Sequence, residues 1–236
     1  MEIRKVEYLD GDILLEATVA YEDKGKKKPV VLVFHAWEGK DPFAEQKAVE
    51  LAKLGFIGCA CDLYGKGIFG RSKQECSALM SPFMADRMLL QKRILAYREL
   101  FSLVPEMDEK KVAAIGFCFG GLCALDLARS GAEVKAVVSF HGLLQGDQSL
   151  DQGPICAKVL AFHGYKDPMV RPEELLSFSK EMDAKKVDFQ LHVFGQAMHA
   201  FTNPKANDPS FGTLYDKESD SRSWNGMRVF FQEVFA

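Results

Sequence analysis

Residues 112–124 have the sequence VAAIGFCFGGLCA, in which an apolar run passes through a glycine-rich turn into a helix-like pattern. The apolar run is too short for a solvent-facing helix and is typical of a buried strand. A Cβ at Gly116 or Gly120 would crowd a tight turn between this strand and the following helix. The sequence therefore predicts a strand, a sharp turn and a helix, with Cys118 at the tip of the turn.

A cysteine in this position is a candidate nucleophile. Its sulfur would face the start of a helix, where unpaired backbone N–H groups and the helix dipole favour a thiolate. The alternative is a structural cysteine buried beside a glycine-rich bend, since free cysteine is among the most buried residue types. The strand-turn-helix context favours Cys118 as the nucleophile of a hydrolase-type turn.

The rest of the chain alternates between apolar strands and amphipathic helices, after an N-terminal hairpin turning at Asp10-Gly11. We expect one domain, residues 1–236, of the α/β class, with a doubly wound, mostly parallel sheet covered by helices on both faces. The predicted strands are 3–9, 12–21, 30–34, 56–63, 112–117, 134–140, 159–162 and 189–194. The predicted helices are 42–54, 84–101, 122–130, 172–182 and 224–235, and residues 64–82 are expected to form a long loop.

Composition excludes several classes of protein. The chain has a formal net charge of -3 and a hydrophobic fraction of 47%, which gives no electrostatic reason to bind nucleic acid or an anionic membrane. The only basic run, Lys24–Lys28, is interpreted as a solvated turn. The N-terminus lacks the apolar core of a signal peptide, so we expect a cytoplasmic protein with reduced cysteines.

Metal binding is not predicted. Cys59 and Cys61 alternate with Ala60 on one face of an expected strand, and no second cluster with ligand spacing accompanies them. Packing is the better interpretation of this pair. We expect neither a metal nor another cofactor.

Two further residues complete a plausible catalytic set. A cysteine nucleophile needs a base, and His199 lies in the loop that follows the last predicted strand. In an α/β-hydrolase the acid comes between nucleophile and histidine in chain order, and Asp167 fits that place. Asp147 and Asp151 are the alternatives for the acid, each with an ordinary role in a loop. The oxyanion donors expected for this arrangement are the backbone N–H groups of Phe119 and Trp37.

The chain resembles the dienelactone hydrolase family of α/β-hydrolases over essentially its whole length. The resemblance is carried by Gly116-Phe117-Cys118-Phe119-Gly120-Gly121, by the His163-Gly164-x-x-Asp167-Pro168 turn and by His199-Ala200-Phe201. It implies a Cys118, His199, Asp167 triad that acts on esters or lactones without a cofactor. Within this family, the chain also resembles a member that has phosphotriesterase activity.

The chain departs from the dienelactone-active members of that family at two places. Their glutamate after the third strand matches Ala36 here, and Glu38 follows two residues later. Their arginine, which holds the substrate carboxylate, is absent from the Asn203-Pro204-Lys205 segment, and a lysine cannot supply the bidentate fork of arginine. We therefore expect a neutral substrate rather than dienelactone.

An apolar pocket around the sulfur would suit activated aryl esters and neutral phosphotriesters. The candidate lining residues are Ala36, Glu38, Phe69, Phe83, Phe201 and Asn203. Two other classes of protein remain open: a thiol redox protein, for which Cys123 is the nearby second cysteine, and a binding module that keeps the fold without the chemistry. The sequence does not fix the oligomeric state, and we expect a small-molecule ester, lactone or phosphotriester as the ligand.

Overall fold

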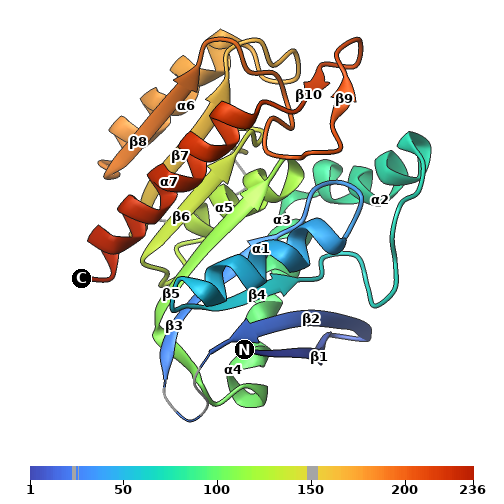
Figure 1. The fold of residues 1–236 in the computed structure, drawn as a ribbon, viewed down its shortest axis with the longest axis vertical. Helices are drawn as coiled ribbons and strands as arrows, with labels where there is room; N and C mark the ends of the chain where they lie inside the picture. The colour runs from blue at the N-terminus through green and yellow to red at the C-terminus, as the bar shows by residue number, and fades with distance from the viewer. Residues whose placement is uncertain (23–24, 26, 148–153) are drawn as a thin grey trace.

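The computed structural model describes the chain except for residues 23, 24, 26 and 148–153. Among the described residues, one sheet has the strand order β1-β2-β4-β3-β5-β6-β7-β8 (Figure 1). These strands are β1 (Glu2–Asp10), β2 (Ile13–Tyr21), β3 (Lys28–Phe34), β4 (Ile57–Cys61), β5 (Met107–Phe117), β6 (Ala136–Phe140), β7 (Lys158–Gly164) and β8 (Phe189–Phe194). The pairings from β4 to β8 are parallel, whereas β2 is antiparallel to both β1 and β4. The predicted mostly parallel sheet is confirmed.

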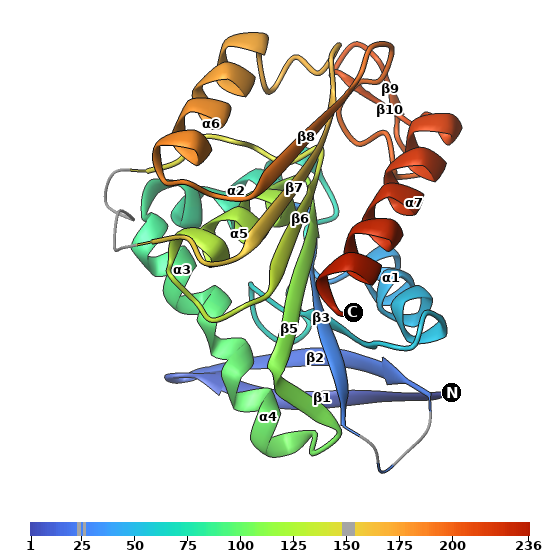
Figure 2. The same cartoon turned by 90° about the vertical axis from the view of Figure 1, so that its left-hand side faces the viewer.

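Helices cover both faces of this sheet, as the alternation of elements predicts. Figure 2 shows α1 and α7 on one face, and α3, α5 and α6 on the other. The helices are α1 (Pro42–Lys53), α2 (Lys73–Ala85), α3 (Arg87–Leu95), α4 (Leu100–Leu103), α5 (Phe119–Arg129), α6 (Pro172–Ala184) and α7 (Lys217–Val234), with a 3₁₀ turn, η1 (Ala96–Glu99), before α4.

The central strands are buried on both faces, which explains their continuous apolar sequences. In β3, Val31 and Val33 pack in the apolar cluster beneath α1 and α7. Val30 and Leu32, which alternate with them, pack in the cluster on the opposite face. The sheet is therefore a rigid layer between two apolar cores, and its strand ends are held in fixed positions.

The prediction of a loop over 64–82 is wrong in its second half, where α2 begins at Lys73. The side chain of Ser72 accepts a hydrogen bond from the backbone N–H of Glu75, and the Glu75 carboxylate accepts one from the N–H of Arg71. These two side-chain hydrogen bonds mark the start of the helix, and they form a variant of the Ser-x-x-Glu pattern that favours helix starts. Pro82 lies inside the helix, which disguises its helical pattern.

The prediction of one helix over 84–101 is wrong, because the chain is divided at Asp86 by a second capping side chain. The Asp86 carboxylate accepts a hydrogen bond from the N–H of Leu89 and so begins a new helix, α3. The last helix starts at Lys217 rather than at Trp224, because Asp216 caps it through the N–H of Ser219. In each case a capping side chain sets the boundary more strongly than the apolar pattern.

A small two-stranded element, β9 (Asn207–Asp208) and β10 (Thr213–Leu214), was not predicted. It lies near the carboxyl ends of the parallel strands (Figure 1). Two lysines of the predicted basic turn, Lys24 and Lys26, lie outside the described residues. The parallel strands bring their final residues and the loops after them to one edge of the sheet, where ligand sites of such folds occur.

Candidate active site

Cys118 lies in a sharp turn between β5 and α5, as the glycine-rich sequence predicts. Its backbone has φ of 56° and ψ of -118°, and positive φ costs a residue with a Cβ roughly 1–3 kcal/mol. A Cβ on Gly116 would lie 1.8 Å from the carbonyl oxygen of Gly120, and one on Gly120 would lie 2.1 Å from that of Phe34. Glycine is therefore required at both positions, and the turn holds the half-buried Cys118 at the start of the helix.

His199 and Asp167 form a buried pair at the same edge of the sheet. His199 Nδ1 lies 2.7 Å from Asp167 Oδ2, and the two side chains are 2% and 0% exposed. The second oxygen of Asp167 accepts the N–H of Met169 at 2.8 Å. Because the carboxylate faces Nδ1, it fixes the orientation of the imidazole and leaves Nε2 as the nitrogen that can exchange a proton.

The electrostatic environment of His199 favours its charged form. Burial opposes that charge, but the nearby Cys118 sulfur and the hydrogen-bonded Asp167 carboxylate outweigh it and raise the pKa of His199 to about 10. His199 Nε2 is buried, and a hydrogen bond with the Cys118 side chain also raises the pKa of His199. An imidazolium beside a sulfur is the charge arrangement of a cysteine nucleophile with its base.

The two expected oxyanion donors are positioned by different elements. The N–H of Phe119 is at the start of α5, and Trp37 lies in the loop after β3. Within the described part of the chain, neither N–H donates a hydrogen bond to another group. Their role as oxyanion donors stays a prediction.

Glu38 is half-buried, and its carboxyl group interacts with His199. Burial raises the pKa of Glu38, while a hydrogen bond from the Trp37 side chain and the charge of His199 act in the opposite direction. Glu38 is therefore an acidic group within electrostatic range of His199. Ala36, the preceding candidate, has only a methyl group.

The remaining candidate lining residues lie in different surroundings. Phe201 is fully buried, with its ring 5.0 Å from that of His141, and Phe83 is 7% exposed in the core on the α5 side. Phe69 is exposed and lines a cavity of about 370 Å³ together with Lys40 and Arg71. A pocket role for these three rings stays a prediction.

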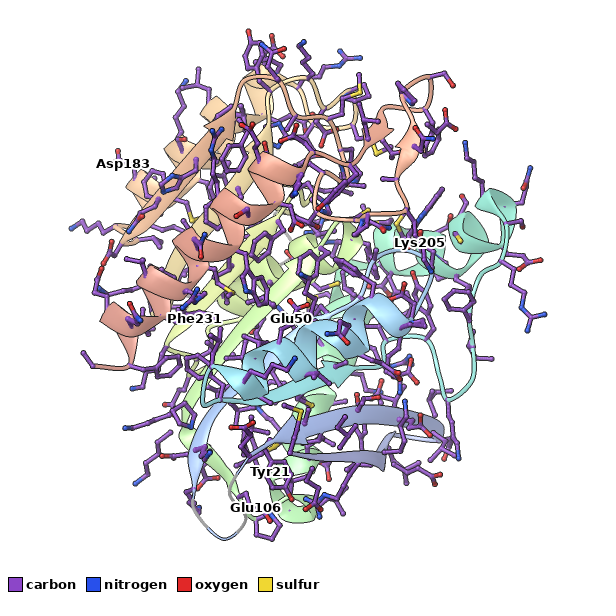
Figure 3. The ribbon with its side chains drawn as sticks, in the orientation of Figure 1. Tyr21, Glu50, Glu106, Asp183, Lys205 and Phe231 are labelled. Carbon is purple, nitrogen blue, oxygen red and sulfur yellow. The ribbon has the colours of Figure 1, made fainter. Side chains whose placement is uncertain are left out.

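The polar segment after Phe201 is largely open to solvent. Asn203 accepts the N–H of Lys205 through its side-chain oxygen at 2.9 Å. Lys205 is exposed, and its charge interacts with Asp41 at the start of α1; Figure 3 shows Lys205 at that end of the molecule. No arginine takes the place of the carboxylate-binding residue in this segment.

The other cysteines that were singled out are packed in the core. Cys59 and Cys61 are buried on one face with their sulfurs 3.9 Å apart, which confirms that they share a face. Cys123 is fully buried, and burial raises its pKa well above the ordinary value for a thiol. A buried thiol of this kind is a poor resolving partner for Cys118. Among the described residues, no three His, Cys, Asp or Glu side chains gather as a metal site would require.

Of the two alternative acids, the structure describes one. Asp147 lies in the loop after β6, and Asp151 lies outside the described residues. His192 is exposed on β8, as its place in the strand predicts, whereas His35, His141 and His163 are buried at strand ends. Among the described residues, His199 is the histidine that is hydrogen-bonded to an aspartate.

The unpredicted β9–β10 hairpin supports the His199 loop. The N–H of His199 donates to the carbonyl of Gly212 at 3.0 Å, and its carbonyl accepts the N–H of Leu214 at 3.1 Å. The same hairpin carries Phe211, whose ring stacks on Trp37 at 5.8 Å. Gly212 has a positive φ and packs closely on Pro168. Two-residue strands have too few residues to produce a detectable alternation, although Gly212 marks the turn.

A mostly parallel sheet with a strained cysteine turn after β5 and a buried His-Asp pair after later strands defines an α/β-hydrolase. The model of the dienelactone hydrolase family matches residues 15–235. The chain therefore belongs to the dienelactone hydrolase family and is a hydrolase.

Similar proteins agree with this assignment. A solved structure of a dienelactone hydrolase-like promiscuous phosphotriesterase from metagenomic libraries is 36% identical, with a TM-score of 0.93 over 99% of this chain and 98% of the other. A protein of Aquifex aeolicus, provisionally named a carboxymethylenebutenolidase, is 32% identical over 209 residues, covering 86% of this chain and 87% of its own. A Caenorhabditis elegans protein is 37% identical over 154 residues, covering 62% and 95%. Within the described segments, no helix has the length and apolar character needed to cross a membrane.

Proposed function

We propose that this hydrolase cleaves neutral carboxylic esters and lactones, with Cys118 as nucleophile, His199 as general base and acid, and Asp167 as the residue that orients His199. The observation that carries the proposal is the electrostatic coupling of the strained Cys118 turn to the buried His199–Asp167 pair. Each of the three residues follows a different strand of the sheet, at the edge where ligand sites of such folds occur, and this supports the proposal.

The proposed reaction has two steps. The Cys118 thiolate attacks the carbonyl carbon, and the N–H groups of Phe119 and Trp37 receive the oxyanion. As the carbon–oxygen bond breaks, the His199 imidazolium gives its Nε2 proton to the leaving oxygen, which yields a thioester and an alcohol. Neutral His199 then takes a proton from water, whose oxygen attacks the thioester. Loss of the sulfur releases the acid and restores the thiolate and imidazolium.

The same groups suit a neutral phosphotriester. The thiolate would attack phosphorus, the phosphoryl oxygen would take the place of the carbonyl oxygen, and an aryl oxide would leave. A sulfur–phosphorus bond is weaker than the oxygen–phosphorus bond that a serine would form, which favours release by water. The similar structure described as a promiscuous phosphotriesterase supports this second substrate class.

The charges around the site favour neutral substrates. Glu38 is an acidic group that interacts with His199, and the exposed Lys205 is the cation in the Asn203–Lys205 segment. A substrate carboxylate would meet Glu38 without a guanidinium to bind it. An anionic dienelactone is therefore expected to be a poorer substrate than an uncharged aryl ester.

The proposal is tested by turnover of an aryl carboxylate ester and an aryl phosphotriester with matched leaving groups. In Cys118→Ala both activities should fall by several decades, and the exposed Cys156→Ala should match the wild type as a thiol control. Survival of either activity in Cys118→Ala would mean that the chemistry uses other residues. Cys123→Ser should retain turnover, which would exclude a redox pair with Cys118.

A further inference from the structure

We propose that His141 is a positioning residue, a neutral imidazole that fixes the Cys118 turn against the loop that carries His199. His141 follows β6 and is 2% exposed. The inference rests on the proposed function, because it assigns a role to a residue beside the same sulfur. It concerns the distance between nucleophile and base rather than their identity.

Two hydrogen bonds place the His141 ring between the two loops. The backbone N–H of Cys118 donates to His141 Nδ1 at 3.2 Å and also to the carbonyl of Phe140 at 3.1 Å. Because an N–H group is the donor, Nδ1 has no proton, and the neutral ring carries its proton on Nε2. Nε2 lies 2.8 Å from Thr202 Oγ1 and therefore donates to that hydroxyl.

The surroundings keep His141 neutral. Burial, and next to it the charge of His199, lower the pKa of His141 well below its ordinary value. A proton on Nδ1 would also oppose the Cys118 N–H, so geometry and electrostatics require the same form of the ring. A second imidazolium here would destabilise the charged His199, whose ring lies 5.3 Å away.

The backbone at the three connected places is unusual. Cys118, His141 and Ala200 all have positive φ, at 56°, 40° and 57°. Such conformations persist where surrounding contacts over-determine them, and they cluster at functional sites. The imidazole supplies those contacts, since one ring nitrogen holds the Cys118 turn and the other holds Thr202 in the His199 loop. His141 therefore sets how the sulfur and His199 Nε2 face each other.

The first test compares His141→Leu with His141→Asn. An asparagine oxygen can occupy nearly the position of Nδ1 and accept the Cys118 N–H, whereas leucine cannot. We expect His141→Leu to lower kcat by about 100-fold with KM within about threefold of wild type, because misplacement of a reacting group by 1 Å can cost about that factor. The kcat of His141→Asn should be at least about tenfold higher than that of His141→Leu. An equal loss in both variants would overturn the proposal.

The pH profile separates positioning from simple structural support. If the sulfur and imidazole move apart, their ion pair is weaker, so the pH range of full kcat/KM should narrow from both sides in His141→Leu. Rates are divided by the fraction of folded protein measured by circular dichroism, which corrects for any unfolded enzyme. A lower thermal midpoint with an unchanged pH profile per folded enzyme would overturn the proposal.

Thr202 provides a second test if the His141 variants fail to fold. Thr202→Val keeps the shape but removes the acceptor, and we expect kcat to fall by about tenfold, whereas Thr202→Ser should remain within about twofold of wild type. Thr18→Val is the matched control, since Thr18 is also a buried, hydrogen-bonded threonine but lies in β2. Similar losses in Thr202→Val and Thr18→Val, or none in Thr202→Val, would contradict the role of His141.

The proposed function and this inference fail differently. If Cys118→Ala keeps its activity, the assignment of Cys118 as the nucleophile is wrong, whatever the role of His141. If Cys118→Ala is inactive but the His141 and Thr202 variants keep kcat and the pH profile, only the positioning role is wrong.

Discussion

Asp167 Oδ2 lies 2.7 Å from His199 Nδ1, and this contact is almost completely shielded from water. A shielded carboxylate interacts strongly with an imidazolium because the surrounding protein screens charge less than water does. The contact links the loop after β7 to the loop after β8, and it determines which nitrogen of His199 faces Cys118.

Removing the charge of Asp167 should disable His199. In Asp167→Asn an amide replaces the carboxylate, so the orientation and charge of the imidazole are both less favourable. We expect kcat/KM for an aryl ester to fall by about 10³ to 10⁴-fold, in line with such changes in Ser-His-Asp enzymes. Asp188→Asn, at an exposed ion pair with Lys158, serves as the control and should be close to wild type. A loss of less than about tenfold would contradict the assigned role of Asp167.

The pH dependence should follow the raised pKa of His199. Because this pKa is raised to about 10, the imidazolium persists through neutral and mildly alkaline pH, and its proton is lost as pH rises through that value. We expect kcat/KM to decline as pH approaches about 10, and the decline to move to lower pH in Asp167→Asn. A decline centred near the ordinary histidine pKa of about 6.5 in the wild type would contradict this environment.

The glycine at 120 should be indispensable for the turn. A Cβ there would lie 2.1 Å from a backbone carbonyl oxygen, which cannot move aside as a flexible side chain can. We expect Gly120→Ala to lower the free energy of unfolding by at least about 2 kcal/mol, as overpacking in a core does. Gly195→Ala is the control, because a Cβ there meets no atom within 4 Å. Denaturant unfolding measures both, and equal stability of the two variants would refute the prediction.

A network of buried ion pairs between α3 and α5 should stabilise the packing of these helices on the sheet. Asp126 is fully buried and accepts two hydrogen bonds from Arg87, at 2.7 and 2.6 Å, and one from Arg129 at 3.2 Å. Replacing it with leucine would leave the buried Arg87 guanidinium without its carboxylate partner, whereas Arg129 would keep its pair with Glu181. We expect Asp126→Leu to reduce the free energy of unfolding by about 3–5 kcal/mol. A change below about 1 kcal/mol in urea unfolding would show that water or other residues compensate.

Most of the fold could be predicted from local sequence, and the exceptions share a physical cause. Continuous apolar runs such as that at 30–34 indicate strands buried on both faces, and the structure confirms them. The helix start at Ser72 was missed because Pro82 disguises the helical pattern that follows it, and the boundary at Asp86 was missed because the apolar pattern continues through it. The β9–β10 strands depend on contacts with His199 that are distant in sequence.

The candidate site was less evenly predictable. Chain order and strand ends were sufficient to select Cys118, Asp167 and His199, whose residue types carry the chemistry. The contacts of His141 could not be predicted, because a histidine at a strand end looks the same whether it holds another loop or only fills space. Its two bonds join residues 23 and 61 positions away, at Cys118 and Thr202.

The covalent thiol mechanism is tested most directly by the mass of the enzyme, which is quenched with acid during turnover of an aryl ester and mapped by peptide. We expect an acyl group on the peptide that contains Cys118, in wild type and more persistently in His199→Gln, where water is no longer activated. The adduct should be absent in Cys118→Ala. Full turnover without an adduct at Cys118, combined with activity that survives Cys118→Ala, would contradict the covalent thiol mechanism.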